Sequence, residues 1–224
     1  MTQAAPSHAG PVEEASARQT QQTRQERAQQ ERTWQAHSAG TESLDGERLS
    51  RLIAAIEHTS HGTLTRLRRF HPLRQPKAVV FEVESVLSAA EISTADAATT
   101  DRWSLLLHCL ALARARRVQR DAATTGRILA RLPMSEMRLR QLLEADFDRL
   151  ADLLPRLARW LDAASTQIDW QPLAELLLHT GTDAEARADR ARRRIVRGYI
   201  GALTVTGSSP ADDAAATEGR PAED

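Results

Sequence analysis

The stretch DRWSLLLHCLALARARRVQ, residues 101–119, joins the most apolar run of the chain to one of its densest groups of arginine. Trp103, Leu106, Leu107 and Leu110 recur at spacings of three and four, which is the period of a helix with a buried face. The spacing predicts a helix over 101–119. Its first part is expected in the core, and its end is expected to carry positive charge.

Apolar residues keep this helical spacing on both sides of the stretch, with breaks at turn-forming residues. Ala, Leu, Arg, Glu and Gln dominate the composition, and these residue types lose little entropy in a helix. We therefore expect an all-α fold, a compact bundle of about eight or nine helices without a strand. The expected helices cover residues 43–58, 61–70, 76–90, 101–119, 124–132, 146–163, 170–179 and 183–203, and Ser135 caps one more.

The two ends of the chain differ in composition from its middle. Residues 1–42 are rich in Gln, Ala, Ser and Thr and contain almost no large aliphatic residue, and residues 205–224 are acidic and rich in Ser, Pro, Ala and Gly. Such segments cannot bury enough apolar surface to offset the entropy lost on ordering. We expect one helical domain over residues 43–204 between two disordered tails.

Several features indicate a soluble, cytoplasmic protein. The chain has one cysteine, Cys109, and no stretch with the pattern of a signal peptide. No apolar run approaches the roughly 18 residues of a membrane span. Because Cys109 lies in an apolar run, we expect a buried and inert thiol rather than a nucleophile.

The formal net charge of zero is a sum over segments of alternating sign. Residues 58–81 carry +5, residues 102–140 carry +7 and residues 187–197 carry +5, whereas residues 82–101 carry −5 and residues 141–186 carry −6. All basic residues except Lys77 are arginine, whose planar guanidinium group suits phosphate better than an ammonium group does. A genome rich in arginine codons would give the same composition.

Helical phasing places many of these arginines on outer faces. Leu64, Leu67 and Phe70 mark the buried side of residues 61–70, so Arg66 and Arg69 should project outward with Arg68 on the flank. In the last helix, Arg192 to Arg194 and Arg197 are expected to remain unpaired and to face outward. Arginine clusters without nearby carboxylates favour nucleic-acid backbone as the partner, because each neutralised phosphate releases counterions.

The few aromatic residues favour contact with the backbone rather than reading of sequence. The candidate contacts are Arg66, Arg68, Arg69, Arg114, Arg116, Arg117, Arg120, Arg193, Arg194 and Arg197. Two other interpretations remain open. A basic block can be an ordinary solvated helix face, and it can also pair with an acidic protein partner.

The sequence gives little indication of catalysis. It contains no Gly-rich phosphate loop and no nucleophile elbow, so we expect no enzyme and no cofactor. His58 and His61 lie three apart beside Glu57, which is the one candidate for a pair of metal ligands. A helix break near Ser60 and the lack of a second ligand pair favour ordinary surface histidines.

Five stretches in order carry a family resemblance: HGTLTRLRR at 61–69, LRQLLEAD at 139–146, LADLLPRLARWL at 150–161, IDWQPLAELLL at 168–178 and the Arg-rich stretch that ends in Tyr199. Together they resemble the CasB small subunit of Cascade, the type I-E CRISPR surveillance complex. The resemblance implies an all-helical, non-catalytic subunit. It also implies two copies arranged head to tail over guide RNA and target DNA, where they help to hold the displaced strand.

The resemblance makes the arginines of residues 62–69, together with Arg194 and Arg197, candidate phosphate contacts. Ile195 and Gly198 depart from the aromatic and acidic residues that the family often has near this end. The sequence as a whole predicts a subunit that binds other Cascade subunits, nucleic acid and a second copy of itself, without a membrane. The alternative is a helical adaptor whose arginine blocks pair with an acidic protein partner.

Overall fold

The computed structural model describes residues 45–94, 96–116, 125–132 and 134–207. Of these, residues 47 to 207 lie in one compact unit of the chain, Glu47–Asp224. Every regular element among the described residues is a helix, which confirms the expected all-α class. Of the two expected tails, residues 1–42 and 208–224 lie outside the described residues, whereas residues 205–207 continue the last helix.

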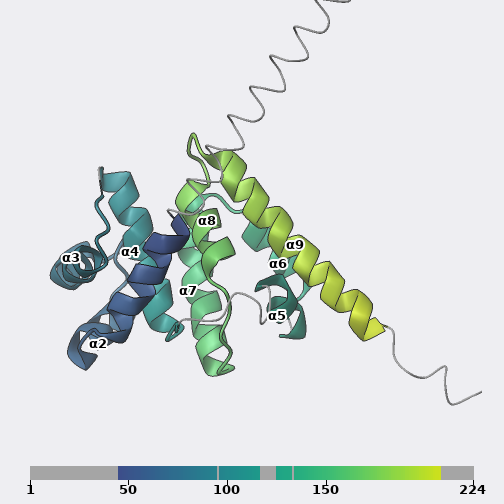
Figure 1. Cartoon of the computed structure of the whole chain (residues 1–224), viewed down its shortest axis with the longest axis horizontal. Coiled ribbons are helices and arrows are strands. Elements are labelled where there is room, and N and C mark those ends of the chain that lie inside the picture. The colour runs from purple at the N-terminus through teal and green to yellow at the C-terminus, as the bar shows by residue number, and fades with distance from the viewer. Residues whose placement is uncertain (1–44, 95, 117–124, 133, 208–224) are drawn as a thin grey trace, which may run out of the picture. The chain divides into compact units, whose positions relative to one another are not determined.

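A helix over residues 45–57 comes first. The elements that follow are α2 (His61–Arg69), the 3-10 helix η1 (Pro76–Ala78), α3 (Val80–Ala89), α4 (Ala97–Leu112), α5 (Thr125–Arg131), α6 (Glu136–Leu143), α7 (Phe147–Ala163), α8 (Gln171–His179) and α9 (Glu185–Gly207). In Figure 1, α4, α7 and α8 lie between α2 and α3 on one side and α5 and α9 on the other. None of the described helices is long and apolar enough to cross a membrane.

Several helices begin where a side chain accepts a hydrogen bond from the backbone of the third residue beyond it. Ser60 caps α2 in this way, Asp96 caps α4, Ser135 caps α6 and Asp146 caps α7. Each cap satisfies a backbone N–H that has no partner inside the helix. Ser135 is the cap that the sequence predicts, and Asp146, the first residue of the expected helix over 146–163, caps α7.

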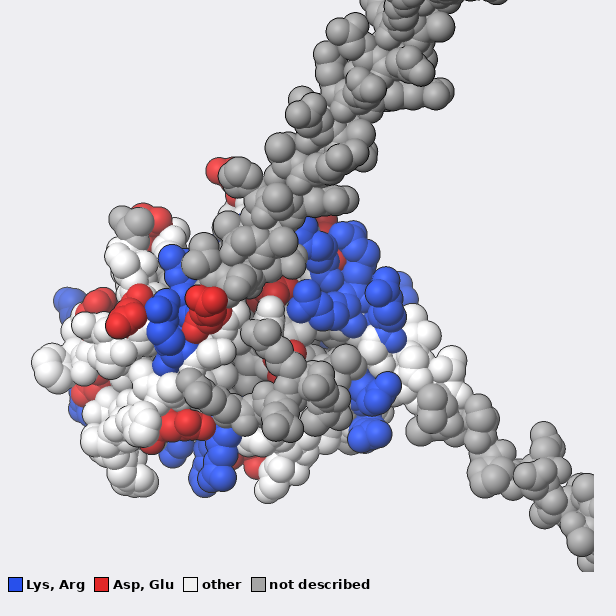
Figure 2. Space-filling model, in the orientation of Figure 1, with Lys and Arg blue, Asp and Glu red and all other residues white. Residues whose placement is uncertain are grey.

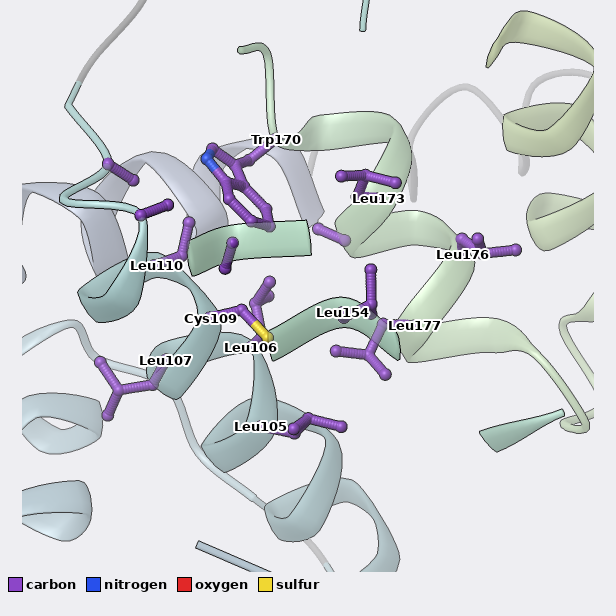
Figure 3. Close-up of a cluster of buried hydrophobic side chains, with 14 of the residues drawn as sticks. Leu105, Leu106, Leu107, Cys109, Leu110, Leu154, Trp170, Leu173, Leu176 and Leu177 are labelled. Carbon is purple, nitrogen blue, oxygen red and sulfur yellow. The ribbon is translucent and has the colours of Figure 1, made fainter. Parts of the chain in front are cut away.

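The core is built around α4. All ten residues from Trp103 to Leu112 are buried. Figure 3 shows Leu106 and Leu110 of α4 near Leu154 of α7 and near Trp170, which precedes α8. Cys109 lies in the same cluster and is fully buried, and burial raises the pKa of its thiol. The expected inert, buried thiol is therefore confirmed as buried.

The end of α4 differs from the expectation. The helix ends at Leu112 rather than at residue 119, because Arg114 adopts a left-handed conformation with φ of 48°. The N–H of Ala115 then donates to the carbonyl of Leu110, and the N–H of Arg114 donates to the carbonyl of Ala111. This is the Schellman pattern, which usually has glycine in the left-handed position. With arginine there, the sequence shows no stop signal.

The buried His108 and the half-buried His71 connect α2, α4 and α7. His108 of α4 donates from Nδ1 to the carbonyl of Leu67 at 2.6 Å, and His71 donates from Nε2 to the carbonyl of Ala151 at 3.2 Å. Their ring centroids lie 5.1 Å apart. Burial, with the neighbouring His71 and Arg159 as smaller contributions, lowers the pKa of His108 to about 4, so this ring is neutral at pH 7.

Helices α5 and α9 approach each other closely at one glycine. A Cβ atom added at Gly126 would lie 1.9 Å from the carbonyl oxygen of Ile195 and 2.6 Å from the backbone N of Tyr199. Both are backbone atoms of α9, so no side-chain rotation can relieve the overlap. Gly201 in α9 provides the opposite case, since a Cβ atom there would meet nothing within 4 Å.

We expect Gly126→Ala to lower the free energy of unfolding by about 2 kcal/mol or more, because the two helix backbones must separate. Gly201→Ala is the matched control. It should raise the free energy of unfolding by about 0.5–1 kcal/mol, because alanine restricts the unfolded chain without a clash in the helix. Urea unfolding followed by circular dichroism measures both. Equal stability of the two variants would contradict the close contact.

Candidate nucleic-acid interface

Arg66 of the first basic segment is not left unpaired. Its guanidinium group donates to the carboxylate of Glu82 in α3 and to the carbonyl of Ala78 in η1. The side chain of Arg66 remains 50% exposed, whereas that of Glu82 is 13% exposed. The sequence correctly indicates that no acidic residue on α2 pairs with Arg66. Its partner comes from α3 instead, and the pair joins the two helices.

Arg68 is half-buried and bonds to the backbone of α4. Its Nε donates to the carbonyl of Ala111 in α4 at 2.8 Å. Partial burial and the nearby charge of Arg114 lower the pKa of Arg68, while Asp162 opposes that change. A cation at the last turn of a helix also complements the helix dipole. Arg68 therefore has a structural role at the end of α4.

The guanidinium group of Arg69 faces solvent. It is exposed, and no ion pair or hydrogen bond involves its guanidinium group among the residues that the structure describes. The guanidinium carbon lies 5.3 Å from the centroid of the Phe70 ring, a weak cation–π contact that leaves its N–H groups available. Of the three arginines of α2, Arg69 is the one best placed to meet a phosphate.

The second basic segment begins just beyond α4. Arg114 pairs with Asp162 of α7 through an Nε–Oδ1 distance of 3.1 Å, and its side chain is 66% exposed. The backbone N–H of Arg116 donates to Gln167, which holds this turn in place while the exposed Arg116 side chain has no partner in the described part. Arg117 and Arg120 lie outside the described residues.

The expectation that Arg192 faces outward unpaired is wrong. Its Nε donates to the carbonyl of Leu143 at the end of α6, and Nη2 donates to the hydroxyl of Thr180. Its Nη1 donates to Glu185 at 2.6 Å and to Asp189 at 2.7 Å. Partial burial opposes the charge of Arg192, but the bonds to these two carboxylates outweigh it and raise its pKa.

The physical reason lies in the fold around Arg192. Position 192 is on the side of α9 that meets the end of α6 and the loop after α8, so several acceptors surround it. Arg194 behaves in a similar way, with its Nη1 at 3.5 Å from Oε1 of Glu175. The carboxylate of Glu175 is only 4% exposed, and the nearby cation offsets the cost of burying it.

Arg193 and Arg197 are the exposed arginines of α9 without a partner among the described residues. They lie four positions apart, so their side chains leave the same face of the helix. Figure 2 shows basic side chains gathered over α9, with other basic groups of that face lying apart from them. Of the ten sequence-predicted contacts, Arg69, Arg116, Arg193 and Arg197 have exposed side chains without a partner in the described part of the chain, and we call these four the unpaired cations. Other exposed arginines, such as Arg127 and Arg156, share that property but are not among the predicted contacts.

Lys77 has the same properties as the unpaired cations, although the sequence-based candidates do not include it. It is exposed in η1 and has no partner in the described part of the chain. Lys77 lies in η1, which connects α2 to α3. The signal that could have found it in the sequence is its place in the segment of residues 58–81, which contains no carboxylate.

An apolar groove of about 920 Å³ lies between α6 and α9. Its floor is formed by Leu139, Leu143, Val196, Tyr199, Ile200 and Leu203. Ile200 is 54% exposed and Leu203 is 46% exposed, although both are large and apolar. Arg193 and Arg197 line the α9 side of this groove, so these two exposed arginines lie next to an apolar surface.

The described residues contain no group of three or more His, Cys, Asp and Glu side chains that could hold a metal ion. His58 and His61 are both exposed, which is how ordinary surface histidines lie. Nothing in the described geometry therefore favours the interpretation of this pair as a metal site.

A family model provides independent evidence of relationship. Residues 63–199, which run from within α2 to Tyr199 in α9, match the model of the CRISPR-associated protein Cse2. The chain belongs to the Cse2 family. This confirms the resemblance to CasB, the Cse2 subunit of type I-E Cascade. No curated protein and no solved structure matches the chain.

Membership of the Cse2 family identifies the chain as a structural subunit of a CRISPR Cascade complex. The match begins at Thr63 and ends at Tyr199. It therefore includes all of the unpaired cations, the half-buried Arg192 with its partners and much of the groove between α6 and α9. These features belong to the part of the chain that the family shares.

The two neighbours Arg192 and Arg193 provide a test of this division between structural and unpaired arginines. Arg192→Ala should lower the free energy of unfolding by about 1–3 kcal/mol, because it leaves the carbonyl of Leu143 and two carboxylates without their donor. Arg193→Ala should change it by less than about 0.5 kcal/mol. Thermal and urea unfolding measure both variants. A loss for Arg193→Ala as large as that for Arg192→Ala would contradict this division.

Proposed function

We propose that this Cse2 protein is a non-catalytic subunit that holds nucleic-acid backbone without sequence specificity. In the assembled complex it stabilises the pairing of guide RNA with target DNA and the displaced DNA strand. A second copy of the chain and the other Cascade subunits are its protein partners. The observation that carries the proposal is the set of unpaired cations, exposed guanidinium groups from α2, from the turn after α4 and from α9.

The unpaired cations support contact with phosphate for a physical reason. An arginine that already donates to protein carboxylates must break those bonds before it meets a phosphate, whereas Arg69 and Arg116 have no such bonds to lose. Each new phosphate contact releases condensed counterions, so the free energy of binding depends strongly on salt. Arg66 and Arg114 are partly exposed but paired, and contribute less in this proposal.

Nucleic-acid binding by the isolated full chain is the direct test. We expect weak binding of single strands and duplex that falls steeply as salt rises. For single strands, loss of one phosphate contact in Arg69→Ala or Arg116→Ala should make the negative slope of log K against log salt less steep by about 0.7. Fluorescence anisotropy at several salt concentrations measures this slope.

Arg51→Ala is the matched control for these variants. Arg51 is also exposed, but it pairs with Glu91 at 3.1 Å, so its removal should leave the slope unchanged. If wild-type protein binds no nucleic acid even at low salt, the proposed backbone contact is wrong. If Arg51→Ala makes the slope less steep by as much as Arg69→Ala does, the salt dependence reflects the total charge of the protein rather than a set of contacts.

The groove between α6 and α9 favours a second function, docking of an acidic protein partner. A partner segment with an apolar face would cover Ile200 and Leu203, and carboxylates along its edge would meet Arg193 and Arg197. The occupant in this proposal is another Cascade subunit. Docking here is compatible with phosphate contacts at Arg69 and Arg116, which lie on other elements.

The double variant Ile200→Asp with Leu203→Asp tests the docking surface. Co-expressed with the other Cascade subunits and a guide RNA, it should be lost from the purified complex, because two carboxylates would be buried against apolar groups. Met137→Asp, at a side chain 64% exposed on α6 that does not line the groove, should keep the wild-type ratio. Retention of the double variant at that ratio would contradict the docking proposal. If light scattering shows that the isolated wild-type chain dimerises and the double variant does not, the occupant is a second copy of the chain instead.

A further inference from the structure

Phe81 is an exposed aromatic residue that the fold does not use. It lies in the first turn of α3 and is 80% exposed, the highest value among the large apolar side chains that the structure describes as exposed. The same helix buries Val83, Val86 and Leu87 on its other side. Because an exposed phenylalanine adds little to folding stability, its ring is available for a ligand.

Cations of α2 and η1 lie on the segments that precede Phe81, while the exposed Glu84 follows it on α3. Arg66 donates to the carbonyl of Ala78 and to the carboxylate of Glu82, so it holds α2 against the chain on both sides of Phe81. Arg69 follows Arg66 by less than one turn of α2, and both guanidinium groups lie over the ring of Phe70. Lys77, exposed and without a partner among the described residues, precedes Phe81 by four positions.

An exposed aromatic ring among cations is the arrangement used to bind single-stranded nucleic acid. Bases stack on the ring whatever their identity, while the cations meet the phosphates on either side. A duplex keeps its bases stacked inside and offers them no such contact. The same ring would therefore distinguish an unpaired strand from a paired one.

We propose that Phe81 is a stacking position for an unpaired nucleobase, with Arg69 and Lys77 contacting the neighbouring phosphates. This inference rests on the proposed function and adds a preference for single strands to it. A protein contact is less well supported at this position. Val80 is the one other exposed large apolar side chain in the described part of α3, whereas six apolar or aromatic side chains line the groove between α6 and α9.

The test measures binding of the full chain to four probes at low salt. They are an oligothymidylate, an oligouridylate, an abasic DNA strand of equal length, which keeps the phosphates but lacks bases, and a DNA duplex. We expect Phe81→Ala to weaken binding of the base-bearing strands about fivefold to tenfold. Its binding of the abasic strand and of the duplex should match that of the wild type.

Three further variants separate stacking from other effects. Phe81→Trp should keep or strengthen binding of the base-bearing strands, and Phe81→Leu should weaken it as Phe81→Ala does, because leucine has no ring. Val80→Ala, at the adjacent exposed apolar residue, should bind all four probes as the wild type does. Circular dichroism checks that each variant is folded, as expected for changes at exposed side chains.

The outcomes distinguish this inference from the function on which it rests. If the wild type binds none of the probes, the proposed backbone contact fails. If the wild type binds but Phe81→Ala or Phe81→Leu binds the base-bearing strands equally well, only the stacking position is wrong. An equal loss on the abasic strand would also overturn it. A loss confined to the DNA or to the RNA strand would support stacking and identify which strand the ring meets.

Discussion

The burial of α4 is the constraint on which the rest of the structure depends. A helix that is apolar on every side must have neighbours on every side, and α2, α7 and α8 supply them. Specific contacts define both ends of α4. Asp96 caps its start, Arg68 meets the carbonyl of Ala111 near its end, and a left-handed Arg114 turns the chain away. Just beyond this turn, the side chain of Arg116 is exposed.

The arginines of this chain divide into those that hold the fold and those that remain available. Arg68 and Arg192 each donate to a backbone carbonyl of another helix, and Arg194 accompanies a buried carboxylate. Buried carbonyl and carboxylate groups need donors, and long arginine side chains can reach across a helix boundary to supply them. The number of arginines in the sequence therefore overstates the positive charge that a ligand would meet.

Much of the fold could be predicted from the sequence, because the apolar spacing of each helix is a local property. Helix α7 follows the expectation of residues 146–163 closely, although Pro155 lies inside it, since the apolar face outweighs one missing backbone donor. The end of α4 could not be predicted, because Arg114 takes a conformation that normally requires glycine. The roles of Arg66 and Arg192 were also beyond the sequence, since their partners on other helices are known only once the chain is folded.

The contact at Gly126 has a consequence for recognising other members of the family. The crossing of α5 and α9 allows no side chain at this position, because backbone atoms of Ile195 and Tyr199 occupy the space. A related chain with a larger residue there must hold α5 farther from α9 at this crossing. Glycine at this position is therefore a local marker of the close crossing of α5 and α9, and it is visible in the amino-acid sequence of a relative as a single letter.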